Sequence, residues 1–170
     1  MKDKSMLNEL FPDGNHLIEE AIAAYYAEGS KKNLVGVLTA IRQRMHEDGQ
    51  FLFPIVMNPE NKDVVAFCTL TTRDGKRWNA AFTSQDEFEK GSPCDLAPNF
   101  IDRGLKLTLV SNVAGIIINP WGQSFMLTKE LIQMMFDADG DQDYVISDDQ
   151  ITVELLEAGS FLKKAERNIV

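Results

Sequence analysis

Apolar residues repeat every three or four positions through the first third of the chain, in two separate runs. The first run predicts a helix capped by Asn15 and ending near Glu28. The second predicts a helix capped by Ser30, with an apolar stripe formed by Leu34, Leu38, Ile41 and Met45. Its opposite side is expected to face solvent and carries Lys31, Lys32, Arg42 and Arg44. The short link between the two runs predicts a helical hairpin, which could cover a sheet or form an oligomer interface.

From Phe51 the hydrophobic period changes from helical to strand-like. Three strands are predicted, at Phe51–Met57, Val64–Thr72 and Arg77–Phe82. Pro54 favours a position at a sheet edge or a bulge for the first strand. Asp74-Gly75 suits a tight turn and so joins the second and third strands as a hairpin. Ser84 and Glu87 then have the spacing of a capping box at the start of a short helix.

The segment from Asp95 to Asn112 carries two conflicting patterns. A strand would explain the alternation of Leu105, Leu107 and Leu109. A helix would explain the four-residue spacing of Ile101, Leu105, Leu109 and Val113. The chain must cross from the strand ending at Phe82 to the next buried strand, and a helical crossover does this economically. We therefore expect a helix over Asp102–Asn112.

The stretch from Val113 to Thr128 is the most regular in the chain. Gly115–Ile118 predicts a strand covered on both faces, and Asn119-Pro120-Trp121-Gly122 predicts a turn. A second strand is expected at Ser124–Leu127, after which Thr128 can cap a helix over Lys129–Phe136. The remainder predicts an acidic loop, a short Tyr144–Ile146 segment and a last helix from about Ile151 to Arg167.

Several of these motifs resemble a known bacterial family. They are Phe53-Pro54-Ile55-Val56, Phe82-Thr83-Ser84, the Gly115–Gly122 stretch and Leu127-Thr128. On these motifs, residues 51–136 resemble the SseB-type N-terminal domain, named for enhanced serine sensitivity. The resemblance implies an α+β fold with a mixed sheet, and it implies no established enzymatic activity or cofactor.

The expected architecture is therefore α+β, with a mixed β-sheet of about five strands, helices packed on it, an N-terminal helical hairpin and a C-terminal helix. The expected divisions are a hairpin packed on the domain at 1–50, an SseB-like core at 51–136, and an acidic loop with a helix at 137–170.

Composition narrows the classes of partner and the compartment. The net charge of −9 argues against sequence-independent nucleic-acid binding, which needs clustered cations. No apolar stretch approaches the roughly 20 residues of a membrane span, and the N-terminus lacks a signal-peptide core, so we expect a cytoplasmic protein with no membrane partner. Cys68 and Cys94 lack metal-site or redox spacing and are expected to be reduced thiols.

An acidic window suggests cation chemistry. Asp137, Asp139, Asp141 and Asp143 imitate the start of an EF-hand loop. However, Gln142 replaces the turn glycine and Asp148 replaces the bidentate glutamate. We therefore expect no metal site beyond weak cation binding, and a solvated acidic linker otherwise.

A second candidate site depends on how two strands pair. If Arg77–Phe82 and Gly115–Ile118 are parallel, their carboxyl ends meet where open α/β sheets place ligands. The side chains brought together there would be Thr83, Ser84, Asn119, Pro120 and Trp121. The alternative is structural: Ser84 only caps a helix and Asn119-Pro120 only turns the chain. Trp121 could likewise plug the sheet or contact a partner, and a turn position favours contact.

No arrangement of nucleophile and base stands out, and His16 and His46, the two histidines, lie near helix ends. We expect a non-catalytic cytoplasmic bacterial interaction or scaffold module without a cofactor, which binds a protein partner or self-associates through the hairpin. The main alternative is a small-ligand binding protein with a cleft near Ser84 and Asn119. An enzyme with an unrecognised site is a further alternative.

Overall fold

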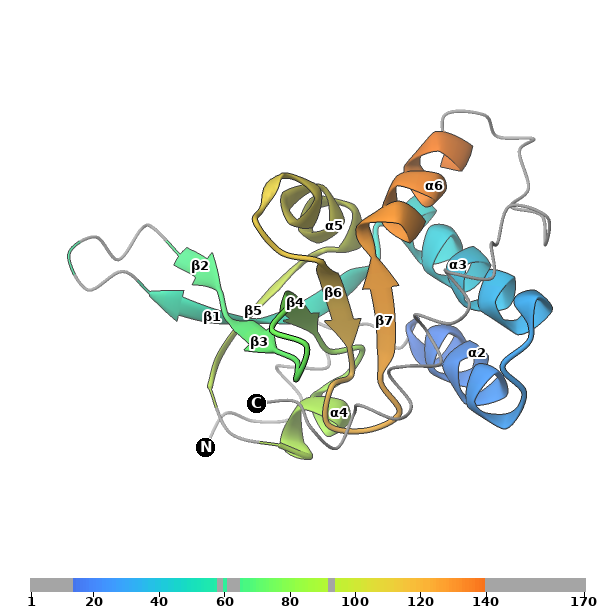
Figure 1. Cartoon of the computed structure of the whole chain (residues 1–170), viewed down its shortest axis with the longest axis horizontal. Helices are drawn as coiled ribbons and strands as arrows, with labels where there is room; N and C mark the ends of the chain where they lie inside the picture. The colour runs from blue at the N-terminus through green and yellow to red at the C-terminus, as the bar shows by residue number, and fades with distance from the viewer. Residues whose placement is uncertain (1–13, 58–59, 61–64, 92–93, 140–170) are drawn as a thin grey trace.

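The computed structural model describes residues 14–57, 60, 65–91 and 94–139 (Figure 1). The helices of this part are α2 His16–Ala27, α3 Lys31–His46, α4 Gln85–Glu89, α5 Ile101–Val110 and α6 Lys129–Asp139. Its strands are β1 Gln50–Met57, β2 Val65–Phe67, β3 Thr69–Thr71, β4 Arg77–Ala81, β5 Asp95–Phe100, β6 Gly115–Ile118 and β7 Phe125–Thr128. The segments predicted at Tyr144–Ile146 and from Ile151 onward lie outside the described residues. None of the described helices is long and apolar enough to cross a membrane.

The strands form two sheets, with the orders β2-β1-β5 and β3-β4-β6-β7. Only β4 and β6 pair in parallel, so the described strands confirm an α+β fold of mixed type. The described residues contain seven strands in two sheets, where one mixed sheet of about five strands was expected. A bridge joins them, in which Leu52 N donates to Phe82 O at 2.9 Å and Phe82 N donates to Leu52 O at 2.8 Å.

The strand predicted over Val64–Thr72 is divided at Cys68, and its two halves join different sheets. Cys68 N donates to Pro54 O at 2.9 Å, which shows that the backbone polar edge of Pro54 faces this junction. In an antiparallel ladder the N–H and C=O of one residue face the same neighbour. Pro54 has no N–H to donate, and its position on β1 lies just beyond Phe67, where the pairing between β1 and β2 stops. This is how proline occupies a central strand, where an edge or a bulge was expected.

The structure resolves the ambiguous segment after Asp95 into two elements. Asp95–Phe100 is a strand that pairs antiparallel with β1, and it was not predicted. The expected helix over Asp102–Asn112 is confirmed as α5 at Ile101–Val110. The polar residues and Pro98 in β5 are weak strand formers, and so tertiary pairing with β1 determines that strand.

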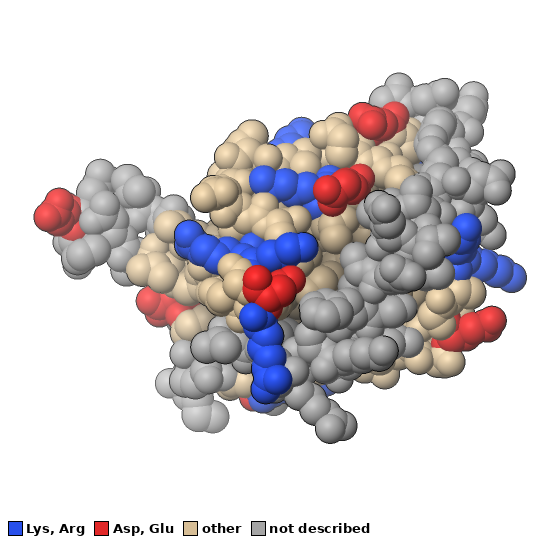
Figure 2. Space-filling view, in the orientation of Figure 1, with Lys and Arg blue, Asp and Glu red and all other residues tan. Residues whose placement is uncertain are grey.

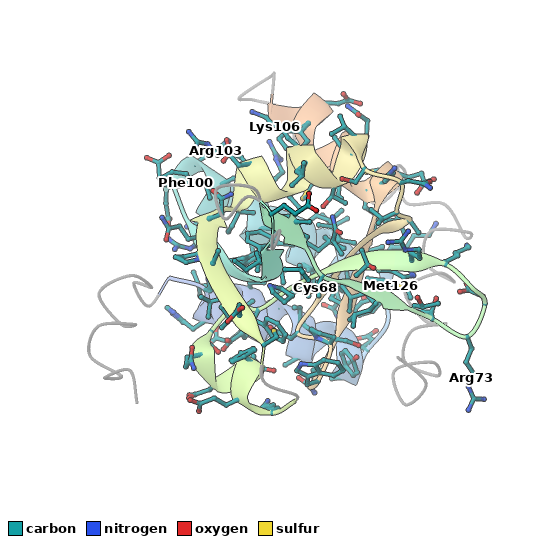
Figure 3. All side chains as sticks on the ribbon, turned by 90° about the vertical axis from the view of Figure 1, so that its left-hand side faces the viewer. Cys68, Arg73, Phe100, Arg103, Lys106 and Met126 are labelled. Atoms are coloured by element: carbon teal, nitrogen blue, oxygen red, sulfur yellow. The ribbon has the colours of Figure 1, made fainter. Side chains whose placement is uncertain are left out.

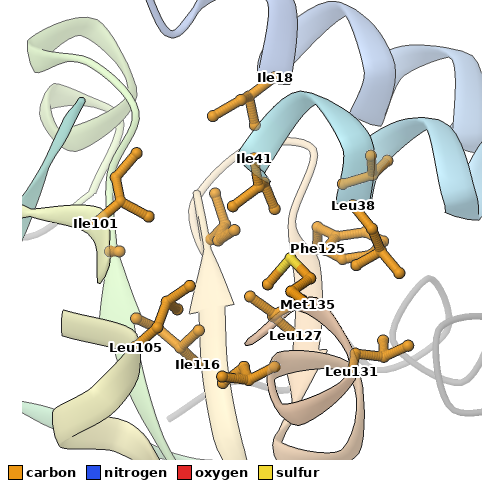
Figure 4. Close-up of a cluster of buried hydrophobic side chains, with 14 of the residues drawn as sticks. Ile18, Leu38, Ile41, Ile101, Leu105, Ile116, Phe125, Leu127, Leu131 and Met135 are labelled. Carbon is orange, nitrogen blue, oxygen red and sulfur yellow. The ribbon is translucent and has the colours of Figure 1, made fainter. Parts of the chain in front are cut away.

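The main core lies between the second sheet and the helices. Alternate residues of β6 and β7 face α2, α3, α5 and α6. Figure 4 shows the strand side chains in contact with those of the helices: Ile116, Phe125 and Leu127 from the strands, and Ile18, Leu38, Ile41, Leu105 and Met135 from the helices. Tyr25 of α2 meets the Phe125 ring edge-on at 5.7 Å between centroids. The helical hairpin therefore covers the sheet and buries its apolar stripes within the same chain.

Two expectations about the hairpin need correction. Asn15 stands at the N-cap position of α2, but its side chain makes no capping hydrogen bond; its Nδ2 donates instead to Gln50 O at 2.7 Å and to Thr83 O at 3.0 Å. Arg44 is not on the solvent side: it is 7% exposed, and its Nε donates to Asn15 Oδ1 at 3.0 Å. Helical periodicity could not reveal either position, because these contacts come from distant segments. Ser30 does cap α3, accepting from Asn33 N at 3.1 Å.

Candidate functional site

The parallel pairing of β4 with β6 brings two predicted site residues together. Ala81 lies opposite Ile118, so Thr83 and Asn119 leave the sheet at the same end. Asn119 Oδ1 accepts from Thr83 N at 2.9 Å, and Asn119 Nδ2 donates to Thr83 Oγ1 at 2.9 Å. Asn119 has a φ of 54°, a left-handed conformation that asparagine tolerates better than most residues. Its turn geometry thus holds the amide against Thr83.

The same pair is tied to the helical hairpin. Thr83 Oγ1 donates to Glu19 Oε1 at 2.6 Å, and Thr83 O accepts from Asn15 Nδ2. Both Thr83 and Asn119 are buried. Buried polar groups that satisfy one another this completely hold elements in place. This arrangement favours the structural interpretation of Thr83 and Asn119.

Ser84 and Pro120 also have local structural roles. Ser84 Oγ accepts from Glu87 N at 3.2 Å at the start of α4, which is half of the expected capping box. The Glu87 carboxylate pairs instead with Lys90, whose Nζ donates to Glu87 Oε1 at 2.7 Å. Pro120 is buried in the turn that Gly122 N closes by donating to Asn119 O at 3.1 Å.

Trp121 differs from its neighbours because it borders a hollow. The half-buried indole lies so close to Gly91 that a Cβ at position 91 would overlap the ring. Its Nε1 is buried without a hydrogen-bond partner among the described residues. The hollow has a volume of about 160 Å³ and is lined by Pro54, Cys68, Leu70, Ala80, Phe82, Cys94 and Trp121. A ligand cleft was expected beside Ser84 and Asn119, and neither of them lines this hollow.

The two thiols at this hollow resist ionisation. Burial is the main cause that raises the pKa of both Cys68 and Cys94, and the nearby charge of Asp95 adds to it. Both cysteines are free, with Cys68 half-buried and Cys94 exposed. They are therefore neutral thiols at physiological pH, as expected for reduced cysteines.

A second hollow, the α5 groove, lies on the opposite face of β4. It has a volume of about 340 Å³ and is lined by Ala66, Phe67, Thr69, Arg77, Asn79, Leu107, Ser111, Asn112 and Val113. Asn79 Nδ2 donates to Thr108 Oγ1 at 3.0 Å and so fixes α5 over the sheet beside the groove. Leu107 falls outside the buried stripe of α5, as does Val110. The positions of Leu107 and Val110 outside the buried stripe of α5 are the signal in the sequence that could have indicated an exposed apolar surface on this helix.

Arg77 is the cationic side chain among the residues that line the α5 groove. Figure 2 shows Lys and Arg together with Asp and Glu side chains over α5 and the β3–β4 hairpin. Arg77 Nη2 donates to Thr69 Oγ1 at 3.3 Å but forms no ion pair within the described residues. Lys129 Nζ donates to Ser111 O at 2.6 Å at the end of α5. Arg103 and Lys106 follow the outside of α5, whereas Arg73 stands at the far tip of the hairpin (Figure 3).

The family model of the SseB protein N-terminal domain matches residues 18–134 of the chain. The matched region is most of the chain. The chain belongs to the SseB N-terminal domain family. The match begins within α2, well before Phe51, so it includes most of the helical hairpin as well as the expected core. Comparisons with curated proteins and with solved structures gave no match.

The acidic window lies beyond the matched residues and is only partly within the described part of the chain. Asp137 and Asp139 belong to α6. Asp137 Oδ1 accepts from Gln133 Nε2 at 3.0 Å, a bond along the helix. Asp141 and Asp143 lie outside the described residues. Within the described part of the chain, no three His, Cys, Asp or Glu side chains are placed to hold a metal ion.

Proposed function

We propose that this SseB domain is a non-catalytic protein-interaction module of the bacterial cytoplasm, and that it binds an acidic segment of a partner protein in the α5 groove. The observation that carries the proposal is the combination of exposed apolar side chains with an arginine that has no carboxylate partner among the described residues. These residues are Leu107, Val110 and Arg77.

The exposed apolar residues are concentrated on one helix. Leu107 is 45% exposed and Val110 is 82% exposed, and their three-residue spacing places them on neighbouring positions of α5. They account for two of the four exposed large hydrophobic side chains in the described part of the chain. Contiguous exposed apolar surface rimmed by polar groups is typical of interaction sites.

The side chains that line the α5 groove indicate what kind of partner segment it can bind. Leu107, Phe67 and Val113 offer contact to an apolar side chain, and Arg77 at the rim can form a two-pronged ion pair with a carboxylate. Arginine is also among the residues enriched at protein interfaces. Because the whole chain carries a net charge of −9, long-range attraction of an acidic partner is not expected. The affinity should depend on the short-range contact with Arg77.

The hairpin is a less suitable surface for self-association than the α5 groove. Its apolar stripes, including Ile22 and Leu38, are buried against the sheet. Leu17, at 43% exposed, is the one exposed large hydrophobic side chain on the described hairpin. An interface formed by the hairpin would therefore offer little apolar area to a second copy.

Peptide binding to the full chain tests this function. The probe is a fluorescent peptide in which one leucine is flanked by glutamates, compared with its lysine counterpart by fluorescence anisotropy. We expect the glutamate peptide to bind and the lysine peptide not to bind. Arg77→Glu should weaken binding at least tenfold, whereas Arg103→Glu, the same charge change outside the groove, should have a much smaller effect. Equal binding of both peptides, or equal effects of both variants, would contradict the proposal.

A second candidate function, small-ligand binding, is favoured by the hollow beside Trp121. That hollow lies on the other face of β4 from the α5 groove, because Ala80 lines the first and Asn79 lines the second. Successive residues of a strand point to opposite faces, so the two surfaces are physically separate.

A further inference from the structure

The hollow beside Trp121 is formed by a small residue between two large ones. Trp78, Ala80 and Phe82 follow one another on the same face of the chain at β4, and only Ala80 is short. Leu70 lies opposite Trp78 on β3 and forms a side of the space. Pro54 and Cys68 close it at the junction of the two sheets. The hollow therefore exists because the side chain of Ala80 is only a methyl group, at a position of β4 where a larger side chain would fit.

Trp121 forms a wall of this hollow that other groups hold in position. The indole lies on Gly91, where no side chain can intervene, and any side chain at position 91 would displace it. On the opposite side, the Asn119 amide fixes the start of the same turn through Thr83. The wall is thus defined before a ligand arrives, which lowers the cost of binding.

The lining determines the chemical class of the occupant. The lining side chains carry no charged group: they are aromatic, aliphatic, proline and two thiols. Both thiols remain protonated at neutral pH, because burial raises the pKa of Cys68 and of Cys94. A charged or strongly polar ligand would lose its hydration without compensation in such a space.

The volume determines the size of the occupant. At about 160 Å³ the hollow is close to an engineered apolar cavity of about 150 Å³ in another protein, which stays dry and binds benzene. We propose that the hollow bounded by Ala80, Cys68 and Trp121 is a binding site for a small uncharged apolar molecule the size of one aromatic ring. This site is independent of the α5 groove and of the function proposed for it.

The test uses benzene as the probe and the full chain under reducing conditions. Isothermal titration calorimetry should show saturable binding to the wild-type protein. Ala80→Leu places a larger side chain into the hollow and should weaken benzene binding at least tenfold. The matched control is Thr69→Leu, which lines the α5 groove on the other face and should leave the benzene affinity within twofold.

A second measurement follows the thiols directly. Benzene bound in the hollow should slow alkylation of Cys68 by iodoacetamide at least threefold in the wild-type protein, and should not slow it in Ala80→Leu. If Ala80→Leu does not fold, Leu70→Phe fills the same space from β3 and should abolish both effects. Absence of saturable benzene binding, or unchanged binding in the folded filling variant, would overturn the proposal. If the wild-type protein binds benzene but does not bind the glutamate peptide, the function proposed for the α5 groove is refuted, and the site proposed in the hollow is not.

Discussion

The side chain of Asn119 closes two hydrogen bonds with Thr83, accepting from its backbone amide and donating to its hydroxyl. These bonds join the ends of β4 and β6, the parallel strands at the centre of the second sheet. Through Thr83 they also reach Glu19 of α2. These hydrogen bonds therefore hold the helical hairpin against this end of the sheet.

This relationship predicts a stability cost at Asn119. Asn119→Gly keeps the left-handed backbone accessible but leaves the buried Thr83 amide unpaired, so it should destabilise the fold by about 1–3 kcal/mol. Asn119→Ala should cost roughly 1 kcal/mol more, because alanine is strained at a φ of 54°. Urea unfolding monitored by circular dichroism measures both values. If both variants have the same free energy of unfolding as the wild type, the side-chain amide of Asn119 does not stabilise this end of the sheet.

Two helical glycines form a matched pair for testing packing. Gly36 of α3 has open space where a Cβ would be, so Gly36→Ala should stabilise the protein by about 1 kcal/mol through helix propensity. Gly104 of α5 lies against Phe53, and a Cβ there would overlap the ring. That ring stacks on Phe67 with centroids 4.7 Å apart, so it cannot move freely. Gly104→Ala should therefore destabilise the fold despite the same gain in propensity.

Thermal unfolding of both alanine variants gives the comparison. A raised melting temperature for Gly36→Ala together with a lowered one for Gly104→Ala is the expected result. A raised melting temperature for both would mean that α5 does not pack against Phe53 as closely as the structure shows.

Glu47 provides a prediction about pH. The hydrogen bond from Arg44 Nη1, at 2.9 Å, is the main cause that lowers the pKa of Glu47, and the bond from Gln43 is the next. Because the pKa is lower in the folded protein, ionised Glu47 stabilises the fold above its ordinary pKa. That contribution is lost as the pH falls through the lowered value.

Nuclear magnetic resonance titration of the Glu47 carboxyl measures this pKa directly. Arg44→Met should raise the pKa of Glu47 towards its ordinary value, and Gln43→Ala should raise it by less. A pKa of Glu47 that is the same in the Arg44→Met variant and in the wild type would disprove the pairing.

Much of the fold could be predicted from hydrophobic periodicity, and the failures have physical causes. The helical hairpin and the turn after β6 follow from local patterns, whereas α5 follows from the crossover that the chain must make between β4 and β6. The strand β5 does not, because Asp95, Pro98 and Asn99 form a strand only when β1 is beside them. The prediction of one continuous strand over Val64–Thr72 fails for a similar reason: the break at Cys68 is set by pairing with Pro54.

The position of Thr83 and Asn119 was predictable, but their hydrogen-bond partners were not. Parallel pairing was enough to bring Thr83 and Asn119 to one end of the sheet. Whether they would face a ligand or each other depended on Glu19 and Asn15, which come from the distant helical hairpin. The α5 groove was missed because its existence depends on how much of the sheet α5 covers, which a sequence pattern does not specify.

Trp121 still has two competing interpretations, as a plug or as a contact residue, and substitution separates them. Its packing on Gly91 leads us to expect that Trp121→Ala destabilises the fold by about 2 kcal/mol, less than a fully buried aromatic, and that Trp121→Phe costs less. Binding of the glutamate peptide should be unchanged, since Trp121 does not line the α5 groove. Unchanged stability with reduced peptide binding would instead identify Trp121 as a contact residue.

The most direct measurement of the proposed function is site-specific photo-crosslinking of the full chain inside the cells that naturally produce it. A photoreactive phenylalanine analogue replaces Val110 on α5 or, as the control, Leu17 on the hairpin, both of which are exposed apolar positions. We expect a discrete protein adduct from position 110, its loss when Arg77→Glu is added, and no comparable adduct from position 17. An adduct at position 110 that survives Arg77→Glu, or a stronger adduct at position 17, would contradict binding in the α5 groove.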